Sequence, residues 1–484
     1  PYVNAKPHIG TALEFIQADA LARYQRLVGN EVIFNTGTDE HGLKVYRKAQ
    51  ELGLDTLEYC TKCAAEFDAL KELLNLSYTN FIRTTDEHHE KAAQEFWMKS
   101  FENGDIYKKN YQVKYCVGCE LEKTDSELEG DRCPIHPNLE IEIIDEENYF
   151  FKFSKYQNAL LELYKENKEF VIPAHRQKEI ENFVKQGLKD FSISRLKEKM
   201  PWGVAVPNDE EHVMYVWFDA LINYISTIGW PNDIKKYKSL WPGVQVAGKD
   251  NLRQQTAMWQ AMLMSAGLPP SKQVFIHGFI TSGGQKMSKS LGNVIDPYEI
   301  VTKYGVDATR YYLLGELPSN EDGDFTIEKF EEFYTAHLVN GIGNLTSRIL
   351  AMLEKYNESK VPAKSKNLLD TVDFWDQYEA AFARYDFHEI VRYINRLVSS
   401  CDELISTEKP WEKTKAGEDI SQLLYVLAEG LRHIAIALLP IIPATAEKIL
   451  DQLNTEERTS LDWGKLEKDG IIKKEGILFE RLEK

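Results

Sequence analysis

The fold of this sequence is decided by one stretch, Gly283-Gly284-Gln285-Lys286-Met287-Ser288-Lys289-Ser290, which lies between an apolar segment, Val274 to Ile280, and a helix start at Asp296-Pro297. Glycine admits backbone conformations that are closed to other residues, so this loop can bend and move. Lysine is a compact charge on a long stem, suited to following a phosphate chain. A mobile basic loop beside a strand end is typical of phosphate handling in α/β enzymes. A solvated surface loop has the same composition, so the loop alone favours phosphate binding only modestly.

A turn near the start of the chain has the residues of an anion-binding corner. His8-Ile9-Gly10-Thr11 follows Pro7 and precedes Leu13 to Leu27, where apolar residues recur at helical spacing. A histidine and a glycine at a helix N-terminus can place N–H groups and the positive end of the helix dipole toward an anion. An ordinary strand-to-helix turn with Thr11 as a cap is the alternative.

Together the two segments resemble the HIGH and KMSKS signatures of class I aminoacyl-tRNA synthetases, in the family's order and with a Rossmann-like length between them. Thr11 replaces the usual second histidine of the first signature. The resemblance implies that His8, Lys286 and Lys289 stabilise the phosphate charge that develops during catalysis. It also implies an ATP-binding set that consists of His8, Gly10, Thr11, Gly248, Asp250, Trp259 and Lys289.

A strand-end turn, Thr36-Gly37-Thr38-Asp39-Glu40-His41-Gly42, follows the apolar Val32-Ile33-Phe34, which we predict to be a short strand. A carboxylate at the carboxyl end of a parallel strand is well placed to pair with a ligand's ammonium group. From the local pattern, a helix cap for Lys44 to Leu52 fits Asp39 equally well. The turn resembles the methionyl branch of the class, which implies that Asp39 holds the α-amino group and that His41 lies in the same pocket.

The segment Val216 to Tyr224 is similar to the side-chain pocket of that branch. Aromatic faces are good neighbours for a thioether sulfur, although core packing of a strand–helix unit explains the same pattern. Asn251 and Gln255 stand where the family has Ile and His, and a glutamine can replace the hydrogen bonds of a neutral histidine. The resemblance implies an L-methionine-binding set that consists of Tyr2, Asp39, His41, Trp217, Ala220, Leu221, Tyr224, Asn251 and Gln255.

Two cysteine-containing pairs have metal-ligand spacing. Cys116-Val117-Gly118-Cys119 and Cys133-Pro134-Ile135-His136 supply three thiols and one imidazole, the ligand set of tetrahedral Zn²⁺. Gly118 is expected to permit the tight turn. Four protein ligands leave no position for water, so the predicted zinc, one ion per chain, is structural. Unligated residues or a redox pair are the alternatives. The other CxxC, Cys60 and Cys63, is expected to be a half-buried helical pair without metal.

The last third of the chain has the pattern of an α-helix bundle. Apolar stripes within 338–353, 390–401 and 423–438 each form a one-sided face that needs the others. By resemblance, Asn344, Arg348 and Trp411 read the anticodon of tRNA(Met). Tryptophan offers a stacking face for an unstacked base, and Arg or Asn can bond base edges. Capping or packing is the alternative for each.

The composition allows several domains in this chain of 484 residues, with 43% hydrophobic and 28% charged residues. No apolar run approaches the ~20 residues needed to span a membrane, so no membrane partner is expected. A net charge of −18 argues against indiscriminate nucleic-acid binding but not against a local basic face. Six cysteines, partly clustered, predict a reducing, cytoplasmic location. We expect a monomer, because no dimerisation module is apparent after the bundle.

The predicted architecture is a Rossmann-type α/β catalytic domain with a parallel sheet over 1–330, followed by an all-α helical bundle that binds the anticodon over 331–484. A connective insertion over 109–201, with a zinc knuckle at 113–140, interrupts the first domain. The resemblance implies a methionine–tRNA ligase that uses ATP with Mg²⁺ to make methionyl-adenylate and then transfers methionine to tRNA(Met).

Two other interpretations fit parts of the pattern. One is a class I synthetase for another aliphatic amino acid, although the insertion is too short for an editing domain. The other is a synthetase-like RNA-binding or regulatory module without activity, suggested by Thr11 and Gln255.

Overall fold

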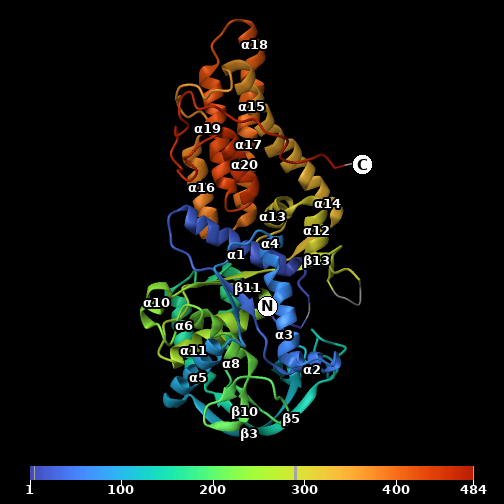
Figure 1. Cartoon of the computed structure of the whole chain (residues 1–484). Helices are drawn as coiled ribbons and strands as arrows, with labels where there is room; N and C mark the ends of the chain where they lie inside the picture. The colour runs from blue at the N-terminus through green and yellow to red at the C-terminus, as the bar shows by residue number, and fades with distance from the viewer. Residues whose placement is uncertain (5, 288–291, 483–484) are drawn as a thin grey trace. The chain divides into compact units, whose positions relative to one another are not determined.

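Two compact units make up the computed structural model, which describes residues 1–4, 6–287 and 292–482 (Figure 1). Each unit is assembled from segments that are distant in the sequence. Unit 1 contains Pro1–Pro7, Ile33–Lys71 and Tyr78–Ile276. Unit 2 contains His8–Val32, Glu72–Ser77 and His277–Lys484. Among the helices of the described residues, none combines the length and hydropathy that a membrane crossing requires.

Parallel strand pairs form part of unit 1, as predicted. β1 (Asn35–Thr38) pairs with β2 (Asn80–Arg83), and β6 (Val171–Ile172) pairs with β12 (Gln273–His277). The first sheet is accompanied by α2 (Leu43–Glu51), α3 (Thr56–Asp68), α4 (Leu70–Leu73) and α5 (Glu87–Glu102). β11 (Val244–Gly248) lies on the other edge of β12.

The first strand differs from the prediction, which put it at Val32 to Phe34 and put Thr36 to Thr38 in a turn. β1 begins at Asn35 and includes Gly37. A Cβ at position 37 would lie 1.8 Å from the carbonyl oxygen of Ile82 on β2. The glycine is therefore a strand residue that admits the neighbouring backbone, a contact set by a residue far along the chain.

A long antiparallel hairpin, β3 (Ile106–Cys116) with β5 (Glu142–Phe151), carries the cysteine-containing segment at one end (Figure 1). β4 (Leu121–Lys123) and β7 (Phe191–Ser192) extend this sheet. A second antiparallel sheet contains β8 (Ser194–Leu196), β10 (Asp209–Met214) and β9 (Ala205–Val206). The strand predicted at His212 to Phe218 thus ends early, and helix starts at Val216. The further helices of unit 1 are α6 (Gln157–Glu166), α7 (Ala174–Lys185), α8 (Val216–Ala220), α9 (Asn223–Ser226), α10 (Ile234–Leu240) and α11 (Trp259–Ser265).

Unit 2 is mainly helical. Its small sheet contains β13 (Ile280–Ser282), β14 (Gln285–Lys286) and β15 (Gly323–Phe325). α1 (Ile9–Leu27) packs on α13 (Val306–Gly315), which follows α12 (Pro297–Tyr304). The bundle contains α14 (Ile327–Phe333), the π-helix η6 (Tyr334–Gly343), α15 (Asn344–Asn357), α16 (Thr371–Ala383), α17 (Phe387–Glu408), α18 (Pro410–Lys415), α19 (Ser421–Leu438) and α20 (Pro443–Leu453).

The predicted bundle is confirmed, with one correction. The stripe residues of η6, α15 and α17 are buried, as expected. The stripe within 423–438 is not one-sided, because every residue of α19 from Leu423 to Leu438 is buried. Helices α15, α17 and α20 all contact it. α19 is therefore the central helix of the bundle.

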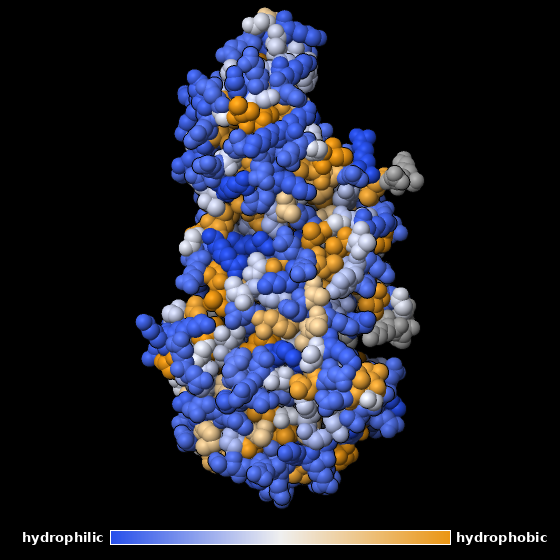
Figure 2. Space-filling view, in the orientation of Figure 1, coloured by the Kyte–Doolittle hydropathy of each residue, from blue (hydrophilic) through white to orange (hydrophobic). Residues whose placement is uncertain are grey.

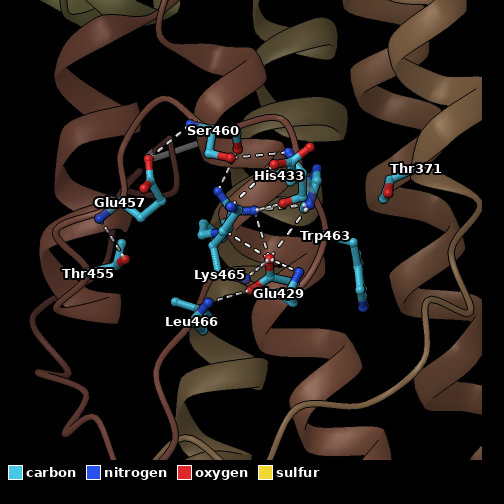
Figure 3. Close-up of polar contacts among 12 residues, drawn as sticks. Thr371, Glu429, His433, Thr455, Glu457, Ser460, Trp463, Lys465 and Leu466 are labelled. Carbon is cyan, nitrogen blue, oxygen red and sulfur yellow. Dashed lines mark hydrogen bonds and ion pairs between the residues drawn. The ribbon is translucent and has the colours of Figure 1, made fainter.

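Two charged residues of α19 are buried as a pair. Arg432 donates to Glu429 Oε1 from Nη2 at 2.7 Å, and Glu429 also accepts backbone N–H groups from Gly464, Lys465 and Leu466 (Figure 3). Burial acts to raise the pKa of Glu429, but these bonds outweigh it and hold that pKa below its usual value. The pair thus fixes the C-terminal segment on the central helix.

Polar side chains cover most of the face drawn in Figure 2, with apolar residues in separate groups.

A buried ion pair joins four segments of unit 2. Arg310 on α13 and Asp19 on α1 are fully buried, with 2.7 Å between Nη2 and Oδ2. Arg310 also donates to the carbonyl oxygens of Leu74, Pro440 and Ile441. Asp19 accepts from the backbone N–H of Ser77 at 2.6 Å. Each partner thus compensates the desolvation of the other.

We expect Asp19→Ala to destabilise unit 2 by about 3–5 kcal/mol, because it leaves the Arg310 guanidinium buried without its counter-charge. Urea unfolding followed by circular dichroism measures this change. The exposed Asp376→Ala is the control and should change stability by less than about 0.5 kcal/mol. Equal stability of the Asp19 and Asp376 variants would refute the assignment.

Candidate active site

His8 caps the N-terminus of α1. Its Nδ1 atom accepts from the backbone N–H groups of Gly10 at 3.1 Å and Thr11 at 3.3 Å. Nδ1 is therefore unprotonated, and in the neutral ring the proton is on Nε2. Burial lowers the pKa of His8 from its ordinary value, so the ring is neutral at pH 7. The cap leaves one N–H donor at the positive end of a helix, as the anion-binding prediction requires.

The lysine-bearing stretch begins as a tight hairpin. Gly283 and Gly284 have φ angles of 60° and 75°, and join β13 to β14. Asp324 holds the hairpin, since its Oδ1 accepts from the N–H of Gly284 at 2.7 Å and from the Thr281 hydroxyl at 2.8 Å. Lys286 lies in β14, paired with Thr281. Lys289 lies outside the described residues.

The two signature segments lie side by side within unit 2. The backbone N–H of Ile9 donates to the carbonyl oxygen of Ile295 at 3.0 Å. The Met287 methyl carbon is 3.9 Å from the Cβ position of residue 10. Residues on both sides of 288–291 therefore contact the turn that contains His8.

In unit 1, Tyr2 and Asp39 are neighbours on adjacent extended segments. They form a parallel bridge, in which Val3 donates to the Asp39 carbonyl at 3.2 Å and Asp39 donates to the Pro1 carbonyl at 2.8 Å. Burial raises the pKa of the Asp39 carboxyl. An ammonium group would stabilise its charged form, which is the role that the sequence predicted for it.

His41 is held by a carboxylate that the sequence did not predict. Its Nδ1 is 2.6 Å from Asp219 Oδ2, and Asp219 Oδ1 is 2.7 Å from Nε2 of His89. Burial acts to raise the pKa of Asp219, but the two histidines outweigh it and hold that pKa at about 2. Burial likewise acts to lower the pKa of His41, and Asp219 raises it overall. The buried Asp219 carboxylate therefore fixes the orientation of the His41 ring.

Gln255 takes part in a buried amide network. Its Oε1 accepts from Gln245 Nε2, while its backbone carbonyl accepts from Gln260 Nε2 at 2.8 Å. Ser271 closes the network by donating its N–H to Gln260 Oε1 at 2.9 Å and its hydroxyl to Gln245. The side-chain oxygen of Gln255 is thus already bonded within the protein.

The other predicted pocket residues lie mainly on or beside the core of unit 1. Ala220 and Leu221 are buried, and Trp217 and Tyr224 are half-buried against the same apolar cluster. Trp259 is fully buried, with its ring centroid 6.2 Å from that of Tyr224. Gly248 ends β11, and the short 3₁₀ turn of Asp250 and Asn251 follows.

The four predicted zinc ligands converge. The ligand atoms of Cys116, Cys119, Cys133 and His136 all lie within 4.8 Å of one another. Cys119 Sγ is 3.5 Å from Cys133 Sγ and 3.2 Å from His136 Nδ1. Tetrahedral Zn–S bonds of about 2.3 Å place two sulfurs about 3.8 Å apart, so the cluster fits this ion. A Cβ on Gly118 would lie 2.5 Å from the His136 ring, so this glycine is needed for the close approach of the ligand.

Cys60 and Cys63, the first CxxC of the chain, lie in α3, as expected. Cys60 is fully buried rather than half-buried, and Cys63 is partly exposed. All six cysteines are among the described residues, and none forms a disulfide.

The predicted anticodon residues lie in the bundle of unit 2. Asn344 and Arg348 are one turn apart on α15, and Trp411 on α18 is 41% exposed. Arg348 forms an ion pair with Asp402 of α17. In the described structure its guanidinium is therefore already paired.

Two family models match segments of this chain. Residues 1–142 and 126–350 match the family model for class I tRNA synthetases (M), and residues 371–482 match the anticodon-binding domain of tRNA ligases. The chain is 44% identical to the methionine–tRNA ligase of Thermosynechococcus vestitus over 93% of this chain and 88% of the relative. The chain belongs to the methionine–tRNA ligase family.

A second relative and a solved structure extend the match. The methionine–tRNA ligase of Thermotoga maritima is 40% identical, over 100% of this chain and 79% of its own. The fold is similar to that of Mycobacterium tuberculosis methionyl-tRNA synthetase in complex with methionyl-adenylate. That match has a TM-score of 0.93 and 34% identity, and covers 99% of this chain and 98% of the other. The fold is thus a class I synthetase catalytic domain with a zinc knuckle, followed by a C-terminal helical anticodon domain.

Asp219, His89 and the Gln245–Gln260 network were missed by the sequence analysis. His41 and Asp219 are 178 residues apart, and no local pattern joins them. The only sequence signal was a charged residue inside an otherwise apolar segment, Trp217 to Leu221. An acid in that position needs a buried partner.

We expect Asp219→Asn to lower stability most between about pH 4 and pH 6.5. The carboxylate contributes fully above its ordinary pKa of 3.8, and its contribution is lost as the pH falls toward its folded pKa of about 2. Because its pKa is raised, His41 adds to the free energy of unfolding below pH 6.5, and this contribution is lost as the pH rises through its folded pKa. Urea unfolding across pH 3 to 8 should show a maximum difference of about 2 kcal/mol. A difference that does not vary with pH would contradict this cluster.

We expect one zinc ion per chain in the purified protein and none in Cys116→Ser, because three ligands bind zinc more weakly than four. Elemental analysis by mass spectrometry measures the ratio. Cys63→Ser, which changes a cysteine outside the cluster, is the control and should keep its zinc. Zinc-free wild-type protein would refute the site.

Proposed function

We infer that the chain is an ATP-dependent methionine–tRNA ligase. The observation that supports this most directly is the contact between the two signature segments in unit 2, with Ile9 bonded to Ile295 and residue 10 beside Met287. The helix N-terminus that His8 caps thus lies beside the segment that carries the lysines. This is an arrangement for stabilising phosphate charge.

The reaction has two steps. A methionine carboxylate oxygen attacks the α-phosphorus of ATP, a P–O bond forms, and the bond to the β-phosphate breaks to release pyrophosphate. The terminal ribose hydroxyl of tRNA(Met) then attacks the carbonyl carbon of methionyl-adenylate, and AMP leaves. Neither step needs a protein nucleophile, so positioning and charge stabilisation provide the catalysis.

We assign the phosphate contacts to His8, Lys286 and Lys289, with Mg²⁺ neutralising charge on the polyphosphate when ATP is bound. His8 Nε2 donates a hydrogen bond and the lysines follow the leaving pyrophosphate. Gly10, Thr11, Gly248, Asp250 and Trp259 complete the set proposed for ATP.

For the amino acid, we propose that Asp39 pairs with the ammonium group of L-methionine. Burial raises its pKa, and an ammonium group beside it would lower that pKa and stabilise the carboxylate. The other residues proposed for this pocket are Tyr2, His41, Trp217, Ala220, Leu221, Tyr224, Asn251 and Gln255.

For tRNA, we propose that Asn344, Arg348 and Trp411 read the anticodon. Arg348 must then exchange Asp402 for a base edge. We further propose one structural Zn²⁺ per chain, a catalytic domain over 1–330 with an insertion over 109–201 and a bundle domain over 331–484, and a monomer that acts in the cytoplasm.

ATP–pyrophosphate exchange with each of the twenty amino acids tests this function. We expect exchange with methionine, and we expect Lys289→Ala to lower its rate by about 10²–10³-fold, because the variant loses a charge that stabilises the transition state. Methionine binding should change little. Lys303→Ala, an exposed lysine on α12, is the control and should react as wild type does.

Exchange with another amino acid would indicate a different class I specificity, and no exchange with any amino acid would refute a synthetase. Wild-type exchange in Lys289→Ala would refute the role of that lysine alone.

A further inference from the structure

Glu120 connects the zinc knuckle to the predicted methionine pocket of unit 1. It follows the ligand Cys119 directly and has a left-handed backbone, with φ of 53°. The residue is 4% exposed. Its Oε1 accepts from the Tyr2 hydroxyl at 2.8 Å and from the backbone N–H of Lys44 at 2.9 Å. Its Oε2 accepts from the Tyr115 hydroxyl at 2.9 Å. A buried carboxylate with three donors is strongly constrained.

Its bond to Lys44 completes a helix start next to His41. α2 begins after Gly42, which has no side chain to cap the helix. Glu120 supplies the acceptor instead, at the end of the helix that favours negative charge. The turn leaves room only for this contact, because a Cβ at position 42 would lie 2.7 Å from the Tyr2 hydroxyl and 3.0 Å from Glu120 Oε1. His41, Gly42 and the first turn of α2 are thus fixed by a residue of the knuckle.

Its bond to Tyr2 fixes the segment that pairs with Asp39. A third connection runs through the backbone, because the Tyr215 hydroxyl donates to the carbonyl oxygen of Glu120. Tyr215 is the N-cap residue of α8, the helix that carries Trp217 and Ala220. Three separate segments of the predicted amino-acid pocket therefore contact Glu120.

The zinc ligands hold the other side of this junction. Tyr115 precedes Cys116, and Glu120 follows Cys119. The hydrogen bond from the Tyr115 hydroxyl to Glu120 Oε2 therefore joins the two residues that flank this pair of ligands. Lys44 Nζ donates to the carbonyl of Gly118 between those ligands at 3.2 Å. Cys116 and Cys119 are joined by only two residues, so the position of residue 120 follows from the geometry of the cluster.

We propose that Glu120 is a positioning residue through which the zinc knuckle sets the affinity for the amino acid. It does not touch the reacting atoms; it holds Tyr2 and the start of α2, which in turn place Asp39 and His41. The inference rests on the function proposed above. It makes a specific claim, namely that the loss of zinc and the loss of the Glu120 carboxylate weaken methionine binding by the same route.

The experiment compares Glu120→Ala and Glu120→Gln with wild type in full-length protein. Zinc content, the methionine Kd without ATP by equilibrium dialysis, and the KM values for methionine and ATP in exchange are measured. Glu120→Ala should keep one zinc per chain, weaken methionine binding about 10- to 100-fold because two or three hydrogen bonds are lost, and leave the KM for ATP within about twofold. Glu120→Gln keeps an acceptor oxygen for Tyr2 and Lys44, so its Kd should stay within about threefold of wild type.

Glu129→Ala is the matched control, an exposed glutamate on the same knuckle, and should bind methionine as wild type does. Removal of zinc by a chelator distinguishes the proposal from a general loss of structure. In wild type and in Glu129→Ala it should weaken methionine binding about as much as Glu120→Ala does. In Glu120→Ala it should cause little further loss, because the connection is already broken.

Three outcomes would overturn the inference: an unchanged methionine Kd in Glu120→Ala, equal losses for methionine and ATP, or fully additive losses from zinc removal and Glu120→Ala. If Glu120→Ala does not fold, Tyr2→Phe, which removes the hydrogen bond from Tyr2 to Glu120, replaces it in the zinc-removal experiment, and fully additive effects of Tyr2→Phe and zinc removal on the methionine Kd then overturn the inference. Absence of methionine-dependent exchange in wild type would instead refute the proposed function.

Discussion

The buried pair of Arg310 and Asp19 is the interaction on which the arrangement of unit 2 depends. Both side chains are fully buried, and each charge compensates the cost of removing the other from water. Because Arg310 also bonds to the carbonyl oxygens of Leu74, Pro440 and Ile441, the pair fixes the relative positions of four chain segments. Asp19 lies on α1, whose first turn His8 caps. The position of the turn that contains His8 is therefore set from the interior of this unit.

Unit 1 uses buried carboxylates in a comparable way. Asp219 divides its two oxygens between His41 and His89, and Glu120 divides its two between Tyr115 and the pair of Tyr2 and Lys44. Each acid orients residues that the sequence assigned to the amino-acid pocket but contributes no predicted ligand contact itself. Buried anions thus hold two residues of the predicted pocket, His41 and Tyr2, and the donors that they hold compensate the desolvation of these anions.

Local patterns predicted most of the helices and the ligand clusters, because their information is contained in a few adjacent turns. Leu13 to Leu27 and Glu87 to Asn103 form helices nearly as expected, and the four zinc ligands converge. The failures depend on distant partners. Gly37 lies in a strand because of Ile82, and α19 has an apparent polar side because Glu429 and Arg432 are charged, although both are buried together. The roles of Asp219 and Glu120 depend on contacts more than 100 residues apart.

The amide network around Gln255 differs from the cluster of His41, His89 and Asp219 in its response to pH. Gln245, Gln255, Gln260 and Ser271 contain no group that titrates in the range where proteins are folded. Their donors and acceptors therefore keep one fixed pattern from acid to alkaline conditions, while His41 and Asp219 change charge. The amide network therefore adds no pH dependence to this region, and any such dependence originates in the titrating groups, among them His41, Asp219 and Asp39.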